Sequence, residues 1–200
     1  MTTSYVSNIG NGSWLRSYYF TRAAFSLVWV AAAYTVAQGK PGLAALMLVL
    51  YPAWDAAANF VDARRNGGLR SNPTQSLNVL VSLATTVAVV IALSISMNMV
   101  IAVVGVWATL SGAFQLGTGF RRWKRYGAQW AIILSGAQSM LAGVLFIGRS
   151  QTALNPQFTD IAPYVAFGAF YFFVSAIWLT VSNWRRSASG SSRGSIVDAS

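Results

Sequence analysis

The sequence predicts an all-α, polytopic integral membrane protein with six transmembrane helices, repeated as three helical hairpins. The first observation is composition: 55% of the 200 residues are hydrophobic and 9% are charged, whereas roughly 25% of residues carry charge in soluble domains. The second is length, because six apolar stretches each reach the ~20 residues needed to cross a bilayer core. The third is that the formal net charge of +10 is spread between these stretches instead of gathering in one domain.

The six predicted spans follow the apolar runs in order. They cover residues 19–37, 42–61, 77–96, 97–119, 130–148 and 164–181. Residues 77–119 are one apolar stretch, which as a single helix would measure about 65 Å, twice a bilayer core. We therefore expect a turn near 94–98. Pro41, Pro73 and Pro163 each precede an apolar run, where a missing backbone N–H costs a helix little.

The hairpins are expected at about 19–61, 77–119 and 130–181, within one transmembrane domain of residues 19–182. Residues 1–18 are expected to form a cytoplasmic N-terminal segment. Residues 183–200 are rich in Ser and Gly and predict a disordered cytoplasmic tail. Arg16 and Arg22 before an apolar run also resemble a signal peptide, so cleavage of the first span is an alternative.

Orientation follows from the positive-inside rule. Twelve of the 14 Lys and Arg residues fall on one side of the predicted spans. Only Lys40 and Arg149 fall on the other. We therefore expect both termini in the cytoplasm.

A polar pattern recurs along the second, fourth and sixth spans. Each begins with an aromatic residue, has polar or small residues four, eight and eleven positions later, and ends with Arg fourteen positions later. The three sets are Tyr51, Asp55, Asn59, Asp62 and Arg65; Trp107, Ser111, Gln115, Thr118 and Arg121; Tyr171, Ser175, Leu179, Ser182 and Arg185. This spacing places each set on one helical face, with Leu179 as the one mismatch.

Small residues form ridges on the fourth and fifth spans, and such ridges favour close helix contacts in lipid. They are Gly105, Thr109, Ala113 and Gly117, then Ser135, Ser139 and Gly143. Packing within the chain is the first interpretation. A homo-oligomer interface is the alternative.

The chain resembles the HdeD-like short-repeat membrane proteins, a family linked to acid resistance and otherwise a domain of unknown function. The resemblance rests on GVWATLSGAFQL at 105–116, the basic exit Arg121-Arg122, and WDAAANFVDARR at 54–65, and covers nearly all of 16–186. It implies a bacterial cytoplasmic (inner) membrane protein with a role in stress or acid tolerance. No active-site signature comes with it.

Asp55 is the most informative residue, because a charge inside a span is costly and needs a partner or water. Asn59 and Asp62 share its face, and Pro52 one turn earlier is expected to kink the helix. The expected cationic partner, for Asp55 or Asp62, is Arg22. The candidate intramembrane polar site therefore comprises Arg22, Asp55, Asn59, Asp62, Gln115 and Gln138.

Three interpretations of this site remain open. An Arg22 ion pair fixes the first hairpin, with Asn59 and Gln115 completing its hydrogen bonds. Alternatively, Asp55 binds a proton or cation in a path lined by Asn59, Gln115 and Gln138. In the third, Arg22 extends to the interface and Asp55 is protonated and inert.

The remaining basic residues predict a lipid-facing rim on the cytoplasmic side, in contact with anionic headgroups. It comprises Arg64, Arg65, Arg70, Arg121, Arg122, Lys124, Arg125, Arg185 and Arg186. We expect no nucleic-acid partner for these charges.

Enzyme function is not expected, because the chain has no His, no Cys and no Glu, and no nucleophile–base or metal-ligand set can be assembled. We expect no metal, cofactor or catalytic residue. Two functions follow: a non-enzymatic membrane protein of stress or acid tolerance, or a small channel or transporter for protons or small solutes using Asp55.

Overall fold

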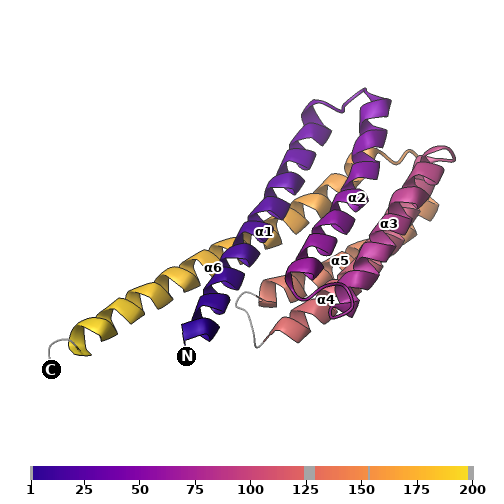
Figure 1. The fold of residues 1–200 in the computed structure, drawn as a ribbon. Helices are drawn as coiled ribbons and strands as arrows, with labels where there is room; N and C mark the ends of the chain where they lie inside the picture. The colour runs from indigo at the N-terminus through magenta and orange to yellow at the C-terminus, as the bar shows by residue number, and fades with distance from the viewer. Residues whose placement is uncertain (1, 124–128, 153, 198–200) are drawn as a thin grey trace.

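The structure, a computed structural model, describes residues 2–123, 129–152 and 154–197, and the side chains of 13–123, 129–152 and 154–185. The predicted all-α fold is confirmed (Figure 1). In these residues the elements are α1 (Thr2–Thr35), α2 (Pro41–Arg65), α3 (Pro73–Leu93), α4 (Met97–Arg122), α5 (Gln129–Thr152), the 3-10 helix η1 (Phe158–Ile161) and α6 (Ala162–Val197).

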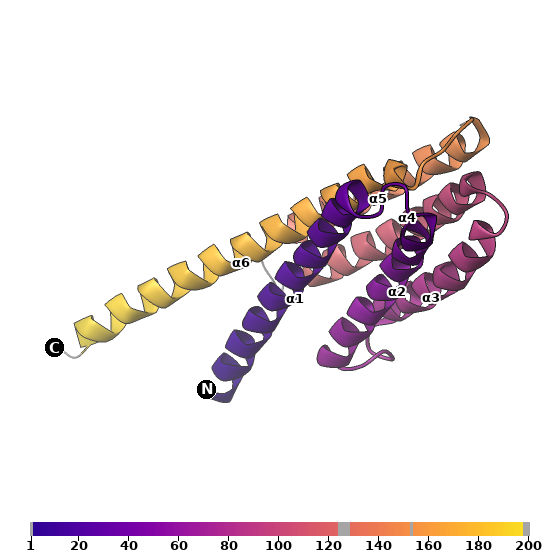
Figure 2. The same ribbon diagram turned by 90° about the horizontal axis from the view of Figure 1, so that it is seen from above.

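Within the described ranges, five helical segments are long and apolar enough to cross a membrane: Pro41–Arg65, Pro73–Leu93, Met97–Arg122, Gln129–Thr152 and Phe158–Arg185. The chain is therefore a multi-pass membrane protein. The predicted first span lies in α1 and is not among the five. It carries Arg22 and two tyrosines, Tyr19 and Tyr34, which lower its hydropathy, yet α1 packs along α6 (Figures 1 and 2).

The boundary between the third and fourth spans lies where the sequence predicts it. α3 ends at Leu93 and α4 begins at Met97. The Ser96 side chain accepts a hydrogen bond from the Met99 backbone N–H at 3.1 Å, which caps the start of α4. Pro41 and Pro73 occupy the first turns of α2 and α3, where a missing N–H is tolerated.

The loop between α2 and α3 is shaped by its glycines and by one side chain. Gly67 and Gly68 have φ of 96° and 88°, a region that other residues rarely adopt. Asn72 Nδ2 donates to the backbone carbonyls of Asn66 and Gly68, both at 2.8 Å. These bonds fix the loop at the base of α3.

The six long helices form a ring in chain order, and α6 closes it against α1. Contacts are most extensive between α4 and α5 and between α1 and α6, and they are slight between α1 and α2. The start of α1 and the end of α6 lie at the same end of the molecule (Figure 1). This end also carries the α2–α3 loop.

The outer surface of the ring is apolar, as a surface in contact with lipid must be. Exposed large side chains include Val28, Leu80, Val87, Leu141 and Leu145. The interior is divided into two halves. The half near Lys40 and Arg149 holds an apolar cluster of Trp29, Ala33, Ala37, Met47, Leu48, Val89, Ala92, Val100, Val104, Trp107, Ile161, Ala162 and Val165. The other half holds most of the buried polar and charged side chains beside a second apolar cluster that includes Leu15, Ile132 and Leu179.

α4 and α5 approach each other at glycines. A Cβ added at Gly112 would lie 2.6 Å from the Gly136 carbonyl oxygen, and one at Gly105 would lie 2.8 Å from that of Gly143. Of the predicted ridge, Gly105 therefore lies in the α4–α5 contact, whereas Gly117 faces Thr74 of α3. The close contact is within the chain, and an oligomer interface stays a prediction.

The helices at the two ends of the chain are longer than the sequence predicts. α1 begins at Thr2, and α6 continues to Val197, past residue 183, where a disordered tail was expected. No proline follows Arg185 to stop the helix. The Ser- and Gly-rich composition therefore did not locate the end of α6.

Candidate functional site

A partly enclosed cavity of about 90 Å³ lies inside the helix ring, and side chains from all six long helices line it. It has room for several water molecules. Its walls combine aromatic side chains with two Arg and two Asp residues, Arg22, Asp55, Asp62 and Arg122. The site is built around these four charges.

The first ion pair joins Arg22 of α1 to Asp55 of α2, so the expected contact is present. The Arg22 guanidinium also donates to the Tyr18 hydroxyl at 3.0 Å and lies 4.4 Å from the centre of the Phe172 ring of α6. Asp55 lies ten residues before the end of α2 at Arg65. That is about 15 Å along the helix, or half the thickness of a bilayer core.

Asp55 accepts three further hydrogen bonds, all at Oδ2. Ser82 Oγ donates at 2.8 Å, Asn59 Nδ2 at 3.1 Å and Asn78 Nδ2 at 3.4 Å. A carboxylate has about four acceptor positions. Each oxygen supplies two of them, so the three donors saturate Oδ2, whereas Oδ1 accepts, among the described residues, only from Arg22.

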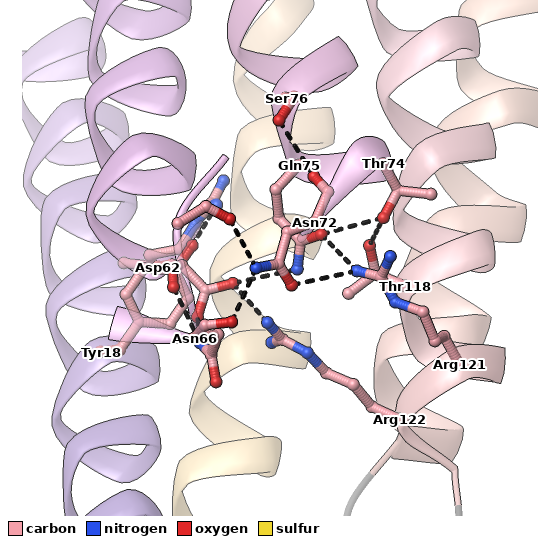
Figure 3. Close-up of polar contacts among 12 residues, drawn as sticks. Tyr18, Asp62, Asn66, Asn72, Thr74, Gln75, Ser76, Thr118, Arg121 and Arg122 are labelled. Carbon is pink, nitrogen blue, oxygen red and sulfur yellow. Dashed lines mark hydrogen bonds and ion pairs between the residues drawn. The ribbon is translucent and has the colours of Figure 1, made fainter. Parts of the chain in front are cut away.

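The second ion pair joins Asp62 of α2 to Arg122 of α4 at 2.8 Å (Figure 3). Asn66 Nδ2 donates to Asp62 Oδ1 at 2.9 Å, and Gln75 Nε2 donates to Oδ2 at 3.3 Å. Arg122 is only 7% exposed. This pair lies seven residues, about 10 Å of helix, closer to the end of α2 than the first.

A polar chain continues from Asp62 toward the end of the bundle (Figure 3). Gln75 Oε1 accepts from Arg121 at 2.6 Å and from Thr74 Oγ1 at 2.9 Å. The hydroxyls of Thr74 and Thr118 are 2.9 Å apart. These bonds hold the start of α3 against the end of α4.

An aromatic layer, defined as Tyr51, Trp107 and Tyr164, lines the cavity and packs against the apolar cluster, of which Trp107 is a member. The ring centroids of Tyr51 and Trp107 are 5.7 Å apart and those of Trp107 and Tyr164 are 6.4 Å apart, both edge to face. Trp107 Nε1 donates to Ser82 Oγ at 3.0 Å, and the same oxygen donates to Asp55. The layer is therefore bonded to the first ion pair.

Several polar groups of the cavity wall lack a partner among the described residues. They are Ser111 Oγ, Gln115 Nε2 and Asn78 Oδ1. Ser111 and Asn78 are 8% and 7% exposed. Buried polar groups are normally bonded to protein or water, so these three are available to a molecule in the cavity.

The structure brings all six residues of the predicted polar site to this cavity: Arg22, Asp55, Asn59, Asp62, Gln115 and Gln138. Asn59 bonds Asp55 as expected, whereas Gln115 Nε2 bonds neither carboxylate. Arg22 pairs with Asp55, and a different residue, Arg122, pairs with Asp62.

The predicted basic rim is wrong at Arg122, which is buried because it neutralises Asp62. Five other members are exposed: Arg64, Arg65, Arg70, Arg121 and Arg185. Lys124 and Arg125 lie outside the described residues, as does the side chain of Arg186.

The repeat pattern locates the cavity face on two of its three helices. On α2 and α4 all four residues of the pattern that precede the arginine line the cavity. On α6, Tyr171 of the pattern lines the cavity but Ser175 and Leu179 do not, and the aromatic residue of the layer is Tyr164, seven residues before Tyr171. The mismatch at Leu179, which is buried in a second apolar cluster, was the signal of this shift.

Sequence reasoning missed the contribution of α3. Its buried polar residues are Gln75, Asn78, Ser82 and Thr85. They recur at intervals of three and four on an otherwise apolar helix, which places them on one face. That spacing was the available signal.

Within the described residues, no group of three His, Cys, Asp or Glu side chains is placed to hold a metal ion. A family model described as "Short repeat of unknown function (DUF308)" matches residues 79–148, from within α3 to near the end of α5. The chain therefore contains this short repeat. Searches of curated proteins and of solved structures gave no match.

Proposed function

We propose that this protein is a non-enzymatic, HdeD-like protein of the bacterial cytoplasmic membrane that passes small solutes across the bilayer. The observation that carries the proposal is the polar cavity on the axis of the ring, which reaches Asp55 at about half the depth of α2. A protein that acted only through packing would have no need of this cavity.

The HdeD-like assignment extends the short repeat at 79–148 to the rest of the chain. Its support is the second related segment, WDAAANFVDARR at 54–65, whose polar residues occupy the cavity wall as those of 105–116 do. A role in stress or acid tolerance is part of this proposal. In this proposal, the protein transports its solute when the cell is under stress or in acid.

The proposed topology has six spans, with α1 as the first and both termini in the cytoplasm. α1 packs along the membrane-spanning part of α6 and contributes Arg22 to the ion pair at the centre of the ring. The exposed arginines at one end of the bundle support the orientation. The cavity then lies in the cytoplasmic half of the membrane.

The proposed mechanism is alternating access and not an open pore. Beyond the aromatic layer, the apolar cluster fills the other half of the ring. A solute that enters from the cytoplasm therefore stops at Tyr51, Trp107 and Tyr164. Because Trp107 is bonded through Ser82 to Asp55, movement of the layer is coupled to the first ion pair.

Asp55 has a positioning role in this proposal. Its Oδ2 is saturated by three donors, and its charge is neutralised by Arg22 at Oδ1 while this pair is intact. The non-enzymatic assignment is supported by a sequence without His, Cys or Glu. The usual nucleophile–base pairs cannot be formed from what remains.

The test is solute flux into proteoliposomes, measured for a panel of charged and uncharged small solutes. Wild type should admit at least one solute faster than protein-free liposomes. Gln138→Phe, which places a ring in the cavity wall, should reduce that flux. Gln151→Phe, the same change at an exposed position of α5, should leave it unchanged.

Flux equal to that of protein-free liposomes for every solute would contradict transport and favour the other function, a stress-tolerance protein that acts through packing or partners. Equal flux in wild type and in folded Gln138→Phe would also contradict it, because the cavity would then not be the path.

A further inference from the structure

We propose that the solute is small and uncharged, and that it carries both hydrogen-bond donors and acceptors, as amides and polyols do. The cavity binds it through Asn78, Ser111 and Gln115. This inference rests on the proposed transport function, since it names the class of solute that the same cavity accepts.

The charges of the cavity argue for an uncharged solute. Two Arg and two Asp side chains line it, and they are paired with each other as Arg22–Asp55 and Asp62–Arg122. An ion or a zwitterion that moved from water into this cavity would meet no unpaired charge of opposite sign among these four side chains. Burial of such a charge is unfavourable, so the paired cavity discriminates against it.

The unpartnered groups argue for a solute with both donors and acceptors. Gln115 Nε2 offers N–H donors, Asn78 Oδ1 offers an acceptor, and the Ser111 hydroxyl can act as either. A purely apolar solute would leave all three unsatisfied. A solute that only accepts, or only donates, would leave at least one of the two amide groups unpaired.

The three groups lie within about one helical turn of one another along the ring. α3 and α4 run antiparallel, and two bonds fix their register: Ser82 with Trp107, and Thr74 with Thr118. Asn78 lies midway between Thr74 and Ser82 along α3. The corresponding positions of α4, midway between Trp107 and Thr118, include Ser111, and Gln115 lies one turn further on the same face.

The same three groups are compatible with water before the solute arrives, because buried polar groups in a roomy cavity bind ordered water. An amide or a polyol replaces those waters bond for bond. A solute that cannot replace them binds less well. The cavity of about 90 Å³ restricts the choice to molecules of a few heavy atoms.

The experiment measures the swelling of proteoliposomes by light scattering after a concentration step of one solute. The uncharged probes are urea, acetamide and glycerol, the zwitterion is glycine, and the ions are potassium acetate and methylammonium chloride. Wild type should admit at least one uncharged probe faster than protein-free liposomes and should not admit glycine or the ions.

Gln115→Leu and Ser111→Ala should slow the uncharged flux about fivefold to tenfold, the range expected for one lost hydrogen bond to the solute. Both variants should fold, because neither side-chain group bonds another residue. Gln151→Leu on the exposed part of α5 is the matched control and should conduct as wild type does.

Selective flux of ions or of glycine would overturn this inference and leave the transport proposal standing. Uncharged flux that Gln115→Leu and Ser111→Ala both leave at the wild-type rate would also overturn it. An absence of flux for every probe would instead contradict the transport proposal itself, and the inference would fall with it.

Discussion

Arg121 and Arg122 are neighbours in the sequence and occupy different environments. Arg121 is exposed and donates to Gln75, whereas Arg122 is 7% exposed and pairs with Asp62. The count of positive charges assigns both to the rim. Only the packing of α4 against α3 and α5 decides which of the two turns inward.

Arg122→Gln should lower the free energy of unfolding by about 3–5 kcal/mol, because the change leaves Asp62 buried without its counter-ion. Arg70→Gln, at an exposed position of the rim, should change it by less than about 1 kcal/mol. Unfolding of the purified protein in mixed micelles measures both. Similar losses in the two variants would show that Arg122 does not serve Asp62.

The pair of Arg22 and Asp55 should show strong coupling in a double-mutant cycle. Arg22→Gln and Asp55→Asn each strand one buried charge and should each cost about 3–5 kcal/mol of unfolding free energy. The double variant removes both charges and should cost clearly less than the sum. Additive losses, measured in the same unfolding assay, would contradict a direct ion pair.

At the scale of helices, the contact of α4 with α5 depends on the absence of side chains. The backbones approach so closely that a methyl group at Gly112 would overlap the Gly136 carbonyl, at 2.6 Å. In lipid, van der Waals packing of this kind is a main source of helix association. The contact therefore supports the α4 and α5 walls of the cavity.

Gly112→Ala should destabilise the protein by about 1–3 kcal/mol, the usual cost of overpacking a close contact. Gly148→Ala lies on the same pair of helices with no atom within 4 Å of the added Cβ, and it should be neutral or slightly stabilising. Thermal unfolding in detergent compares them. A loss in both would point to helix propensity or insertion, and not to the α4–α5 contact.

The helix boundaries could largely be predicted from the sequence, because prolines, a capping serine and apolar length are local signals. The turn at 94–96 is an example. The register of α6 could not, because the pattern that ends on Arg185 starts at Tyr171, and only the neighbouring helices place Tyr164, seven residues earlier, in the aromatic layer. The polar face of α3 was visible in the spacing of Gln75, Asn78, Ser82 and Thr85.

For the whole molecule, charge asymmetry predicts the orientation, and the chain itself permits a direct check because it has no cysteine. Ser71→Cys, in the α2–α3 loop, should react with a membrane-impermeant maleimide only after cells are opened. Gln38→Cys and Asn155→Cys, in the opposite loops, should react in intact cells. The reverse labelling pattern would invert the proposed topology and place the cavity in the outer half of the membrane.

The all-helical membrane fold was predictable because few structures can span a bilayer, and a chain with apolar stretches of this length fits the helical one. The cavity was predictable only in part. Asp55 predicted a polar interior, and Arg22 was the predicted partner of its carboxylate. The second ion pair, however, joins Asp62 and Arg122, which are 60 positions apart. Nothing local in the sequence distinguishes such a partner from eight other basic residues of the same rim.

The sequence separation of the two ion pairs has a consequence for how the chain is inserted during synthesis. Arg22 meets Asp55 after 33 residues, within the first hairpin, so this hairpin can leave the translocon with its deepest charges already neutral. Asp62 has no such partner until Arg122 emerges 60 residues later. The end of α2 must therefore stay near the aqueous interface until the second hairpin arrives, and the cavity closes only when α4 is in place.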